Sequence, residues 1–201
     1  DLGIVACKKG LGKGAFPSKT WSIMSAGTPV IANYDEDTDL ERLVKDNGLG
    51  VFSAADDSEQ MAERIIGALL PDIPNMGQLV KQAYVGKFQT EELTPTVDTG
   101  KFTVLELFRG PTSAFKDVAL CMLPQLLTAA KREKGMQEDI LILTATSGDT
   151  GKAALAGFAN VPGVKICVFY PDGGVSAVQR AQMVTQEGNN VAVCAVKGNF
   201  D

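Results

Sequence analysis

Short apolar runs separated by helix-length amphipathic segments recur along this chain and constrain its fold more than any other feature. The runs are rich in β-branched residues and leucine, as in DILILTAT (139–146), and they have the length of strands. Strands that alternate with helices form parallel sheets, because each helix carries the chain back to the starting edge of the sheet. The sequence therefore predicts an α/β fold of three-layer βαβ units, with one or two parallel sheets covered on both faces.

The predicted elements fall into two groups joined by a less regular connector. The predicted strands are 2–6, 29–32, 50–52, 102–107, 139–146, 164–170 and 190–196. The predicted helices are 17–26, 39–46, 58–70, 78–84, 117–133, 152–159 and 176–186, and residues 86–99 are predicted to be a loop. We therefore expect a first unit over 1–57, a helical and irregular connector over 58–100, and a second α/β unit over 101–201.

Charge and composition exclude several classes of function. The net charge of -5 argues against nucleic acid or an anionic membrane as partner, and no apolar run is long enough to span a bilayer. Histidine is absent, which removes Ser-His-Asp and Cys-His catalysis and imidazole metal sites. The four cysteines lack metal-site or redox-motif spacing, and we expect buried thiols in a reducing, cytoplasmic compartment: Cys7, Cys121, Cys167 and Cys194.

Two features of the second unit place reactive groups where predicted strands meet predicted helices. The segment GPTSAFKD (110–117) is a rigid turn that puts Lys116 at a helix start, behind Phe115. Partial burial and the positive end of a helix disfavour the charged form of an amine, which prepares a lysine to attack a carbonyl carbon. The segment TSGDTG (146–151) is a glycine loop between a strand and a helix, and such loops direct N–H groups and hydroxyls at anions.

Taken singly, each feature also has a structural explanation. Most lysines are solvated surface charges, and a glycine loop before a helix can be an ordinary capped turn. The loop is not a nucleotide P-loop, because Lys152 is followed by Ala153 rather than Ser or Thr. Four long segments occur in order and favour a functional interpretation: LELFRGPTSAFKD (105–117), LTATSGDTGKAAL (143–155), VFYPDGGVSAVQRAQMVTQEG (168–188) and VKGNFD (196–201).

These segments resemble threonine synthase, a fold-type II enzyme that depends on pyridoxal 5'-phosphate (PLP), over about residues 59–201. The resemblance implies that Lys116 is the catalytic lysine that holds PLP, with Phe115 packed beside it. It also implies that the glycine loop surrounds the cofactor and the substrate carboxylate, through Ser147, Gly148, Asp149, Thr150 and Gly151. Aspartate at position 149 favours this family over the cysteine-synthase branch, where Asn is usual.

Threonine synthase converts the small molecule O-phospho-L-homoserine and water to L-threonine and phosphate, and Lys116 would serve as a general base in this lyase reaction. Arg109 stands where many relatives have His, which leaves the contacts to the substrate phosphate open. The family's later glycine-rich loop, which grips the PLP phosphate, is expected beyond Asp201. The resemblance therefore implies a fragment that carries half of a cofactor site.

Residues 1–56 carry a different resemblance. The segment GKGAFPSKTWSIMSAGTPVIANYDEDTDLERLVKDNGLGVFSA (12–54) is similar to the donor-binding part of family-4 GT-B glycosyltransferases. The resemblance implies a sugar-nucleotide diphosphate near Lys13, Lys19 and the amides of Gly27 and Thr28, although the usual pair of glutamates is not evident. An ordinary βαβ unit with a basic loop explains the same residues structurally. The chain is thus expected to be chimeric or truncated, with a seam in the helix over 58–70.

Three functional hypotheses stay open at this point. The chain is a threonine synthase-type PLP enzyme fragment, the sugar-nucleotide-binding portion of a glycosyltransferase, or a catalytically silent chimeric α/β fragment. The first predicts PLP at Lys116, the second predicts a UDP-sugar near Lys13 and Lys19, and the third predicts neither ligand.

Overall fold

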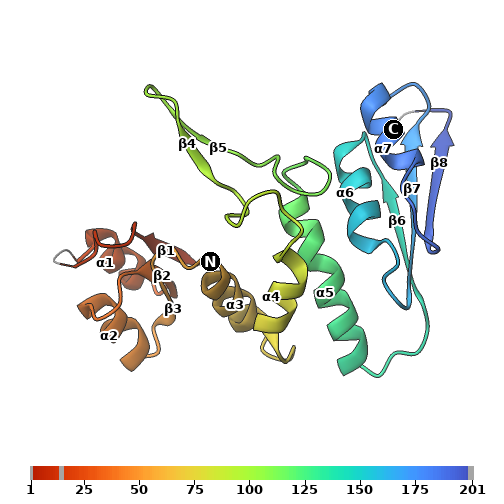
Figure 1. The fold of residues 1–201 in the computed structure, drawn as a ribbon. Helices are drawn as coiled ribbons and strands as arrows, with labels where there is room; N and C mark the ends of the chain where they lie inside the picture. Colours follow the sequence, from red (N-terminus) through yellow and green to blue (C-terminus); the bar gives the residue numbers. More distant parts are fainter. Residues whose placement is uncertain (1, 14–15, 199–201) are drawn as a thin grey trace. The chain divides into compact units, whose positions relative to one another are not determined.

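The computed structural model describes residues 2–13 and 16–198, and the chain divides into two compact units, Asp1–Val80 and Lys81–Asp201 (Figure 1). Residues 14–15 of the basic loop and residues 199–201 of the VKGNFD segment lie outside the described residues. Of the helices in the described ranges, none combines the length and the apolar character that a membrane crossing requires.

The first unit is a parallel three-stranded sheet whose strands alternate with helices. Its elements are β1 (Gly3–Ala6), α1 (Ser18–Ser25), β2 (Val30–Tyr34), α2 (Asp39–Asp46), β3 (Gly50–Ala54) and α3 (Ser58–Leu69), with the strands paired in the order β1-β2-β3. All residues of the central strand β2 are buried, as expected for a strand enclosed on both faces. Thr38 caps α2 by accepting a hydrogen bond from the Glu41 amide, and Asp57 caps α3 in the same way through Gln60. The next helix, α4 (Met76–Tyr84), crosses the boundary between the units.

The second unit begins with an antiparallel hairpin of β4 (Thr96–Asp98) and β5 (Thr103–Leu105). The predicted loop over 86–99 is therefore wrong at β4, and the predicted strand over 102–107 is shorter than expected. Every residue of both strands is exposed. Strand β4 therefore lacks the alternation of buried and exposed residues from which a strand can be predicted.

A second parallel sheet follows the hairpin. Its elements are α5 (Asp117–Glu133), β6 (Ile140–Ala145), α6 (Asp149–Phe158), β7 (Val164–Pro171), α7 (Ala177–Val184) and β8 (Val191–Val196), with strand order β6-β7-β8. The predicted helix over 117–133 and the three predicted strands are confirmed to within one residue at each end. Helix α6 begins at Asp149 rather than at Lys152, so the second half of the predicted glycine loop, residues 149–151, is the first turn of a helix. The α/β class with parallel sheets is confirmed, and β1–β3 and β6–β8 form separate sheets.

The core of the second unit lies between one face of this sheet and α6. Its buried members include Leu155 and Phe158 on α6 and Ile166 and Val168 on β7. Helix α5 packs on α6, and Figure 1 shows the two helices next to each other. Gly157 permits this approach, because a Cβ there would lie 2.2 Å from a backbone carbonyl oxygen of α5.

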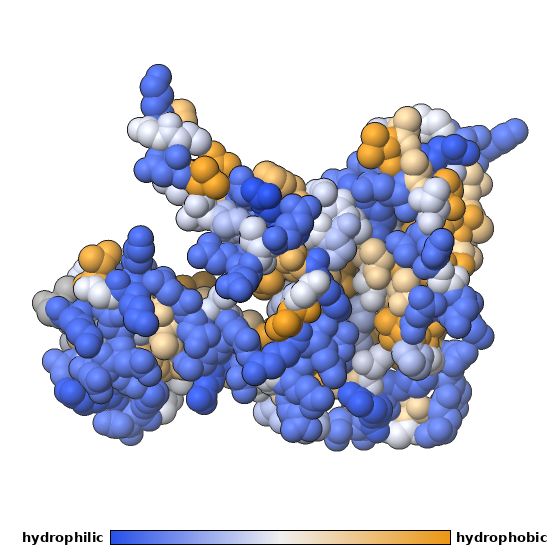
Figure 2. Space-filling model, in the orientation of Figure 1, coloured by the Kyte–Doolittle hydropathy of each residue, from blue (hydrophilic) through white to orange (hydrophobic). Residues whose placement is uncertain are grey.

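The other face of the β6-β7-β8 sheet carries no helix within the described part of this unit. Leu141 and Leu143 on β6 are 60% and 64% exposed, and Val196 on β8 is 45% exposed. Part of this apolar surface is visible over β8 in Figure 2. The prediction of helices on both faces is therefore wrong for this sheet, which has one covered face and one open face.

Candidate functional site

The turn that precedes α5 is built around the carboxylate of Asp117. This side chain is buried, at 2% exposed, and accepts hydrogen bonds from the Thr112 backbone N–H (2.8 Å) and hydroxyl (2.6 Å). The Ala114 N–H makes a longer contact of 3.4 Å to the same carboxylate. Gly110 lies so close that a Cβ on it would be 2.5 Å from the Cβ of Asp117. These contacts fold the turn back onto the start of α5 and fix the backbone beside Lys116, the N-cap residue of that helix.

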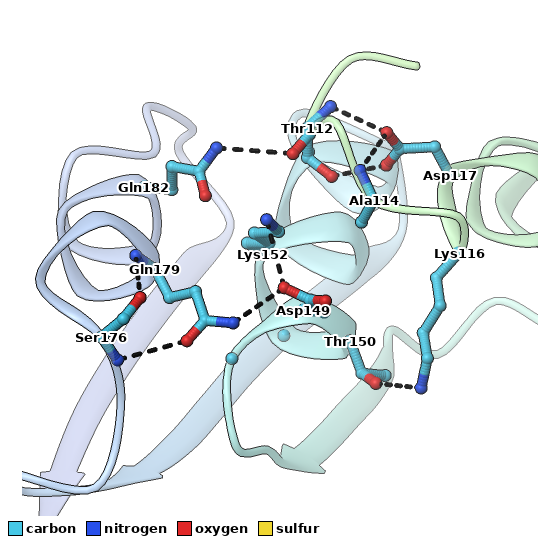
Figure 3. A network of polar contacts seen from close by, with 12 residues as sticks. Thr112, Ala114, Lys116, Asp117, Asp149, Thr150, Lys152, Ser176, Gln179 and Gln182 are labelled. Atoms are coloured by element: carbon cyan, nitrogen blue, oxygen red, sulfur yellow. Dashed lines mark hydrogen bonds and ion pairs between the residues drawn. The ribbon is translucent and has the colours of Figure 1, made fainter. Parts of the chain in front are cut away.

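Lys116 extends from the start of α5 to the first turn of α6 (Figure 3). The side chain is partly buried, and its Nζ donates a hydrogen bond to the hydroxyl of Thr150. The ammonium lies 5.5 Å from the centroid of the Phe115 ring, which is itself 57% exposed. The structure thus brings the predicted lysine to the predicted loop through Thr150, and it makes Phe115 an exposed cation–π neighbour.

Thr146 holds the glycine loop from within. Its buried hydroxyl oxygen accepts hydrogen bonds from the N–H groups of Gly148 and Gly151, each at 3.0 Å. Gly148 has φ 140 and ψ -75, a conformation that side-chain-bearing residues avoid. A Cβ on Gly151 would lie 2.3 Å from the Thr146 methyl group. Gly148 and Gly151 therefore shape the loop, and their amides face inward rather than toward a ligand.

Other amides at the start of α6 are available to a ligand. Among the described residues, no protein group accepts a hydrogen bond from the N–H groups of Ser147, Asp149 and Thr150. The positive end of the helix dipole adds to their field, and a helix start of this kind favours anions. With the Nζ of Lys116 and the hydroxyl of Thr150, these amides form a donor set suited to an anionic ligand that also carries a carbonyl carbon.

Asp149 is hydrogen-bonded to Gln179 of α7 rather than to Lys116 (Figure 3). Its Oδ1 accepts a hydrogen bond from Gln179 Nε2 at 2.9 Å and lies 3.2 Å from Nζ of Lys152. The Gln179 hydrogen bond, and then that of Lys152, hold the pKa of the Asp149 carboxyl below its usual range. Lys152 is buried on α6, and this ion pair compensates the burial of its charge.

Gln179 is held in place by the start of its own helix. Its amide N–H donates to the hydroxyl of Ser176 and its Oε1 accepts from the Ser176 N–H, both at 3.2 Å, which completes a capping box. Gln179 and Lys152 were not predicted as site residues. A signal was present in both cases, because Ser176 and Gln179 have capping-box spacing and Asp149 and Lys152 have the i,i+3 spacing of a helical ion pair.

Arg109 is engaged by neighbours in the second unit. Its Nε donates to Glu106 Oε2 at 2.7 Å, the two side chains form an ion pair, and its Nη1 contacts Gln89 Oε1 at 3.5 Å. The guanidinium is therefore committed to Glu106, although it stays 31% exposed.

The first unit does not offer the amides that the glycosyltransferase resemblance requires. The N–H groups of Gly27 and Thr28 donate to carbonyl groups in the last turn of α1, at 2.9 and 3.2 Å. The N–H groups of Gly10 and Gly12 donate to the Asp35 carboxylate at 2.8 and 2.7 Å. The hydrogen bond from Gly10 is the largest of the effects that lower the pKa of Asp35 below its usual range. The negative end of a helix dipole disfavours a diphosphate, and the N–H groups of Gly27 and Thr28 are already bonded within the protein, which counts against their predicted role.

Lys13 and Lys19, the two lysines predicted to contact a diphosphate, lie in different environments. Lys13 lines a pocket of about 470 Å³ together with the acidic residues Asp37 and Asp39, and Lys19 is exposed on the first turn of α1. This pocket therefore combines one cation with carboxylates, which repel a diphosphate.

Comparison with known proteins finds threonine synthases. No model of a known protein family matches the chain. Threonine synthase of Saccharomyces cerevisiae is 38% identical over 143 residues, which is 66% of this chain and 27% of the yeast protein. Threonine synthase of Pseudomonas aeruginosa is 42% identical over 125 residues, which is 62% of this chain and 26% of that protein. The crystal structure of PLP-bound threonine synthase from Brucella melitensis matches 65% of this chain and 27% of that chain, at 39% identity and a TM-score of 0.57.

The matched part of the chain has a threonine synthase-like fold. The chain spans about a quarter of the length of these relatives, 27% in the yeast protein. The comparisons thus concern one part of a larger enzyme.

Proposed function

We propose that the second unit carries half of the active site of a threonine synthase-like, PLP-dependent enzyme, with Lys116 as the residue that binds the cofactor covalently. The observation that carries the proposal is the meeting of Lys116 Nζ with Thr150 at the start of α6. The similarity to threonine synthases, one of which holds PLP in its crystal structure, supports the same assignment.

The residues present suit this cofactor. PLP is an aldehyde with an anionic phosphate, and when bound it supplies an electron sink for carbanion chemistry. Lys116 provides the amine, and the N–H groups of Ser147, Asp149 and Thr150 provide donors for an anionic group of the cofactor or for a substrate carboxylate. Asp149 completes the proposed set by fixing the first turn of α6 against α7.

The proposed reaction converts O-phospho-L-homoserine and water to L-threonine and phosphate. In this reaction the chain's own contribution is proton transfer and orientation. Nζ of Lys116 acts as the general base, and the Thr150 hydroxyl directs it, because the hydrogen bond between them fixes the end of a long, flexible side chain. Phe115 lies against the ammonium and shields one side of it from water.

Covalent labelling tests the assignment of Lys116. The protein is incubated with PLP, reduced with borohydride and mapped by peptide mass spectrometry. We expect a phosphopyridoxyl group on Lys116 that is lost in Lys116→Ala and kept in Lys131→Ala. Lys131 is a matched control at the far end of α5, where its Nζ donates to the carbonyl of Gly163. Labelling spread evenly over several lysines, or unchanged in Lys116→Ala, overturns the proposal.

For residues 1–57 we infer descent from a glycosyltransferase-like module joined to the threonine synthase-like part, without a sugar-nucleotide function. The parallel sheet β1-β2-β3 with intervening helices supports that descent. The hydrogen bonds already made by the amides of Gly10, Gly12, Gly27 and Thr28 count against a diphosphate site. Addition of a UDP-sugar is therefore expected to leave the Tm of the protein unchanged.

A further inference from the structure

Cys167 and Cys194 lie beside each other on the open face of the β6-β7-β8 sheet. Cys167 is in β7 and Cys194 is in β8, and the register of these parallel strands places Cys167 opposite Ala192 and Phe169 opposite Cys194. The two cysteines therefore point to the same face in diagonal positions. Their Sγ atoms are 3.9 Å apart, although 27 positions separate them in the sequence.

Both thiols can be reached from this face. Cys194 is exposed and Cys167 is partly exposed, and Leu143, the neighbour of Cys167 on β6, is 64% exposed. The prediction of buried thiols is wrong for both residues. The alternation of β7 explains Cys167, because Ile166 and Val168 point into the core and turn the residue between them outward.

The distance between the sulfur atoms decides which chemistry fits the pair. A disulfide requires a separation of about 2.05 Å, so the sulfurs would have to approach by nearly 2 Å from positions on two hydrogen-bonded strands. Two thiolates bound to one tetrahedral ion at about 2.3 Å lie about 3.8 Å apart. The observed 3.9 Å is close to that second value, so both sulfurs can bind one ion with little movement of the strands.

We propose that Cys167 and Cys194 form a two-thiolate binding site for a soft divalent cation of the class of Zn²⁺ and Cd²⁺, separate from the Lys116 site. Each thiol loses its proton to solvent as its sulfur–metal bond forms. Among the described residues no three His, Cys, Asp or Glu side chains gather around a common point, so the pair supplies two of four ligands. Water or donors from a small ligand take the other two positions, one more open position than in catalytic zinc sites, which keep three protein ligands.

Titration of the reduced full chain with Cd²⁺ tests this site. Cadmium–thiolate bonds absorb in the ultraviolet, and we expect this band to saturate at one equivalent, with release of about two protons per ion in weakly buffered solution. Cys167→Ser and Cys194→Ser should each weaken binding by about tenfold or more, because the second sulfur–metal bond forms within one molecule at high effective concentration. Cys7→Ser, which removes a thiol of the first unit, should leave the titration unchanged.

The variants allow a clear refutation. Both replaced residues lie on a solvent-exposed face, so serine is expected to preserve the fold, and circular dichroism of each variant checks this. Affinity that is unchanged in Cys167→Ser or in Cys194→Ser overturns the proposal. An equal loss in the Cys7→Ser control also overturns it, because binding would then be a property of isolated thiols.

Discussion

Replacement of Asp117 by Ala should destabilise the second unit far more than loss of a surface carboxylate. The carboxylate is buried and accepts two short hydrogen bonds from Thr112, one from the backbone and one from the hydroxyl. In Asp117→Ala both donors stay buried without an acceptor, at about 1–3 kcal/mol each. Allowing for partial relaxation of the turn, we expect the free energy of unfolding to fall by about 3 kcal/mol.

Urea unfolding followed by circular dichroism measures this loss, and hydrogen exchange of the α5 amides assigns it to the second unit. Asp139→Ala is the matched control. Asp139 pairs with Lys165 at 3.0 Å, but its side chain is 49% exposed, and an exposed pair of this kind contributes little to stability. A loss in Asp117→Ala no larger than that in Asp139→Ala would show that the turn does not depend on the buried carboxylate.

Three further predictions concern packing, titration and capping. Gly157→Ala should lower the free energy of unfolding by about 1–3 kcal/mol in urea, because its Cβ would lie 2.2 Å from the carbonyl oxygen of Leu120. Burial raises the pKa of Tyr84 to about 12. The contribution of this phenol to the free energy of unfolding is therefore complete below about pH 10 and is lost as the pH rises toward 12. Tyr84→Phe should flatten this alkaline loss in urea midpoints measured at about pH 9 and 11. Gln179→Ala should cost about 1 kcal/mol and raise the pKa of Asp149 toward its ordinary value, as followed by NMR titration.

Local sequence patterns predicted most elements of the second unit because local and tertiary preferences agree there. Helix α5 has acidic Asp117 in its first turn and Lys131 and Arg132 in its last, which mark both ends of the helix. Strands β6 and β7 are mostly apolar runs between turn residues, with Thr144 in β6 and Lys165 in β7 as polar exceptions.

Burial on the two faces of the second sheet could not be predicted in the same way. The run in β6 is apolar at every position except Thr144, which is typical of a strand enclosed on both sides, yet Leu141 and Leu143 face outward. An apolar residue in a strand does not reveal whether another layer covers it. The outward position of Cys167 could not be predicted for the same reason, because the sequence does not show which face of β7 is covered. The proximity of Cys167 to Cys194 depends on the register between β7 and β8, which a local sequence pattern does not determine.

The structure brings Lys116 to the predicted loop, but Gln179, Lys152 and the internal hydrogen bonds of the candidate site were not predicted. Lys116 and Thr150 were placed together by the motifs, and the structure joins them by a hydrogen bond. The position of Asp149 depends on Gln179 of α7, which is distant in sequence and reaches the site only because β6 and β7 are parallel. The hydrogen bond from the Gly148 N–H to the Thr146 hydroxyl, which makes this amide unavailable to a ligand, was also not predictable. A side-chain hydroxyl can accept from nearby backbone N–H groups, and a sequence motif does not show whether it does so.

The most direct measurement is a visible absorption titration with PLP of the intact chain and of Lys116→Arg, with Lys131→Arg as control. Arginine keeps the positive charge and can still donate to Thr150, but it has no primary amine to bond with the cofactor aldehyde. We expect a saturable shift of the cofactor band in the intact chain and in Lys131→Arg, and no shift in Lys116→Arg. The same shift in Lys116→Arg would contradict the assignment of Lys116 as the PLP lysine.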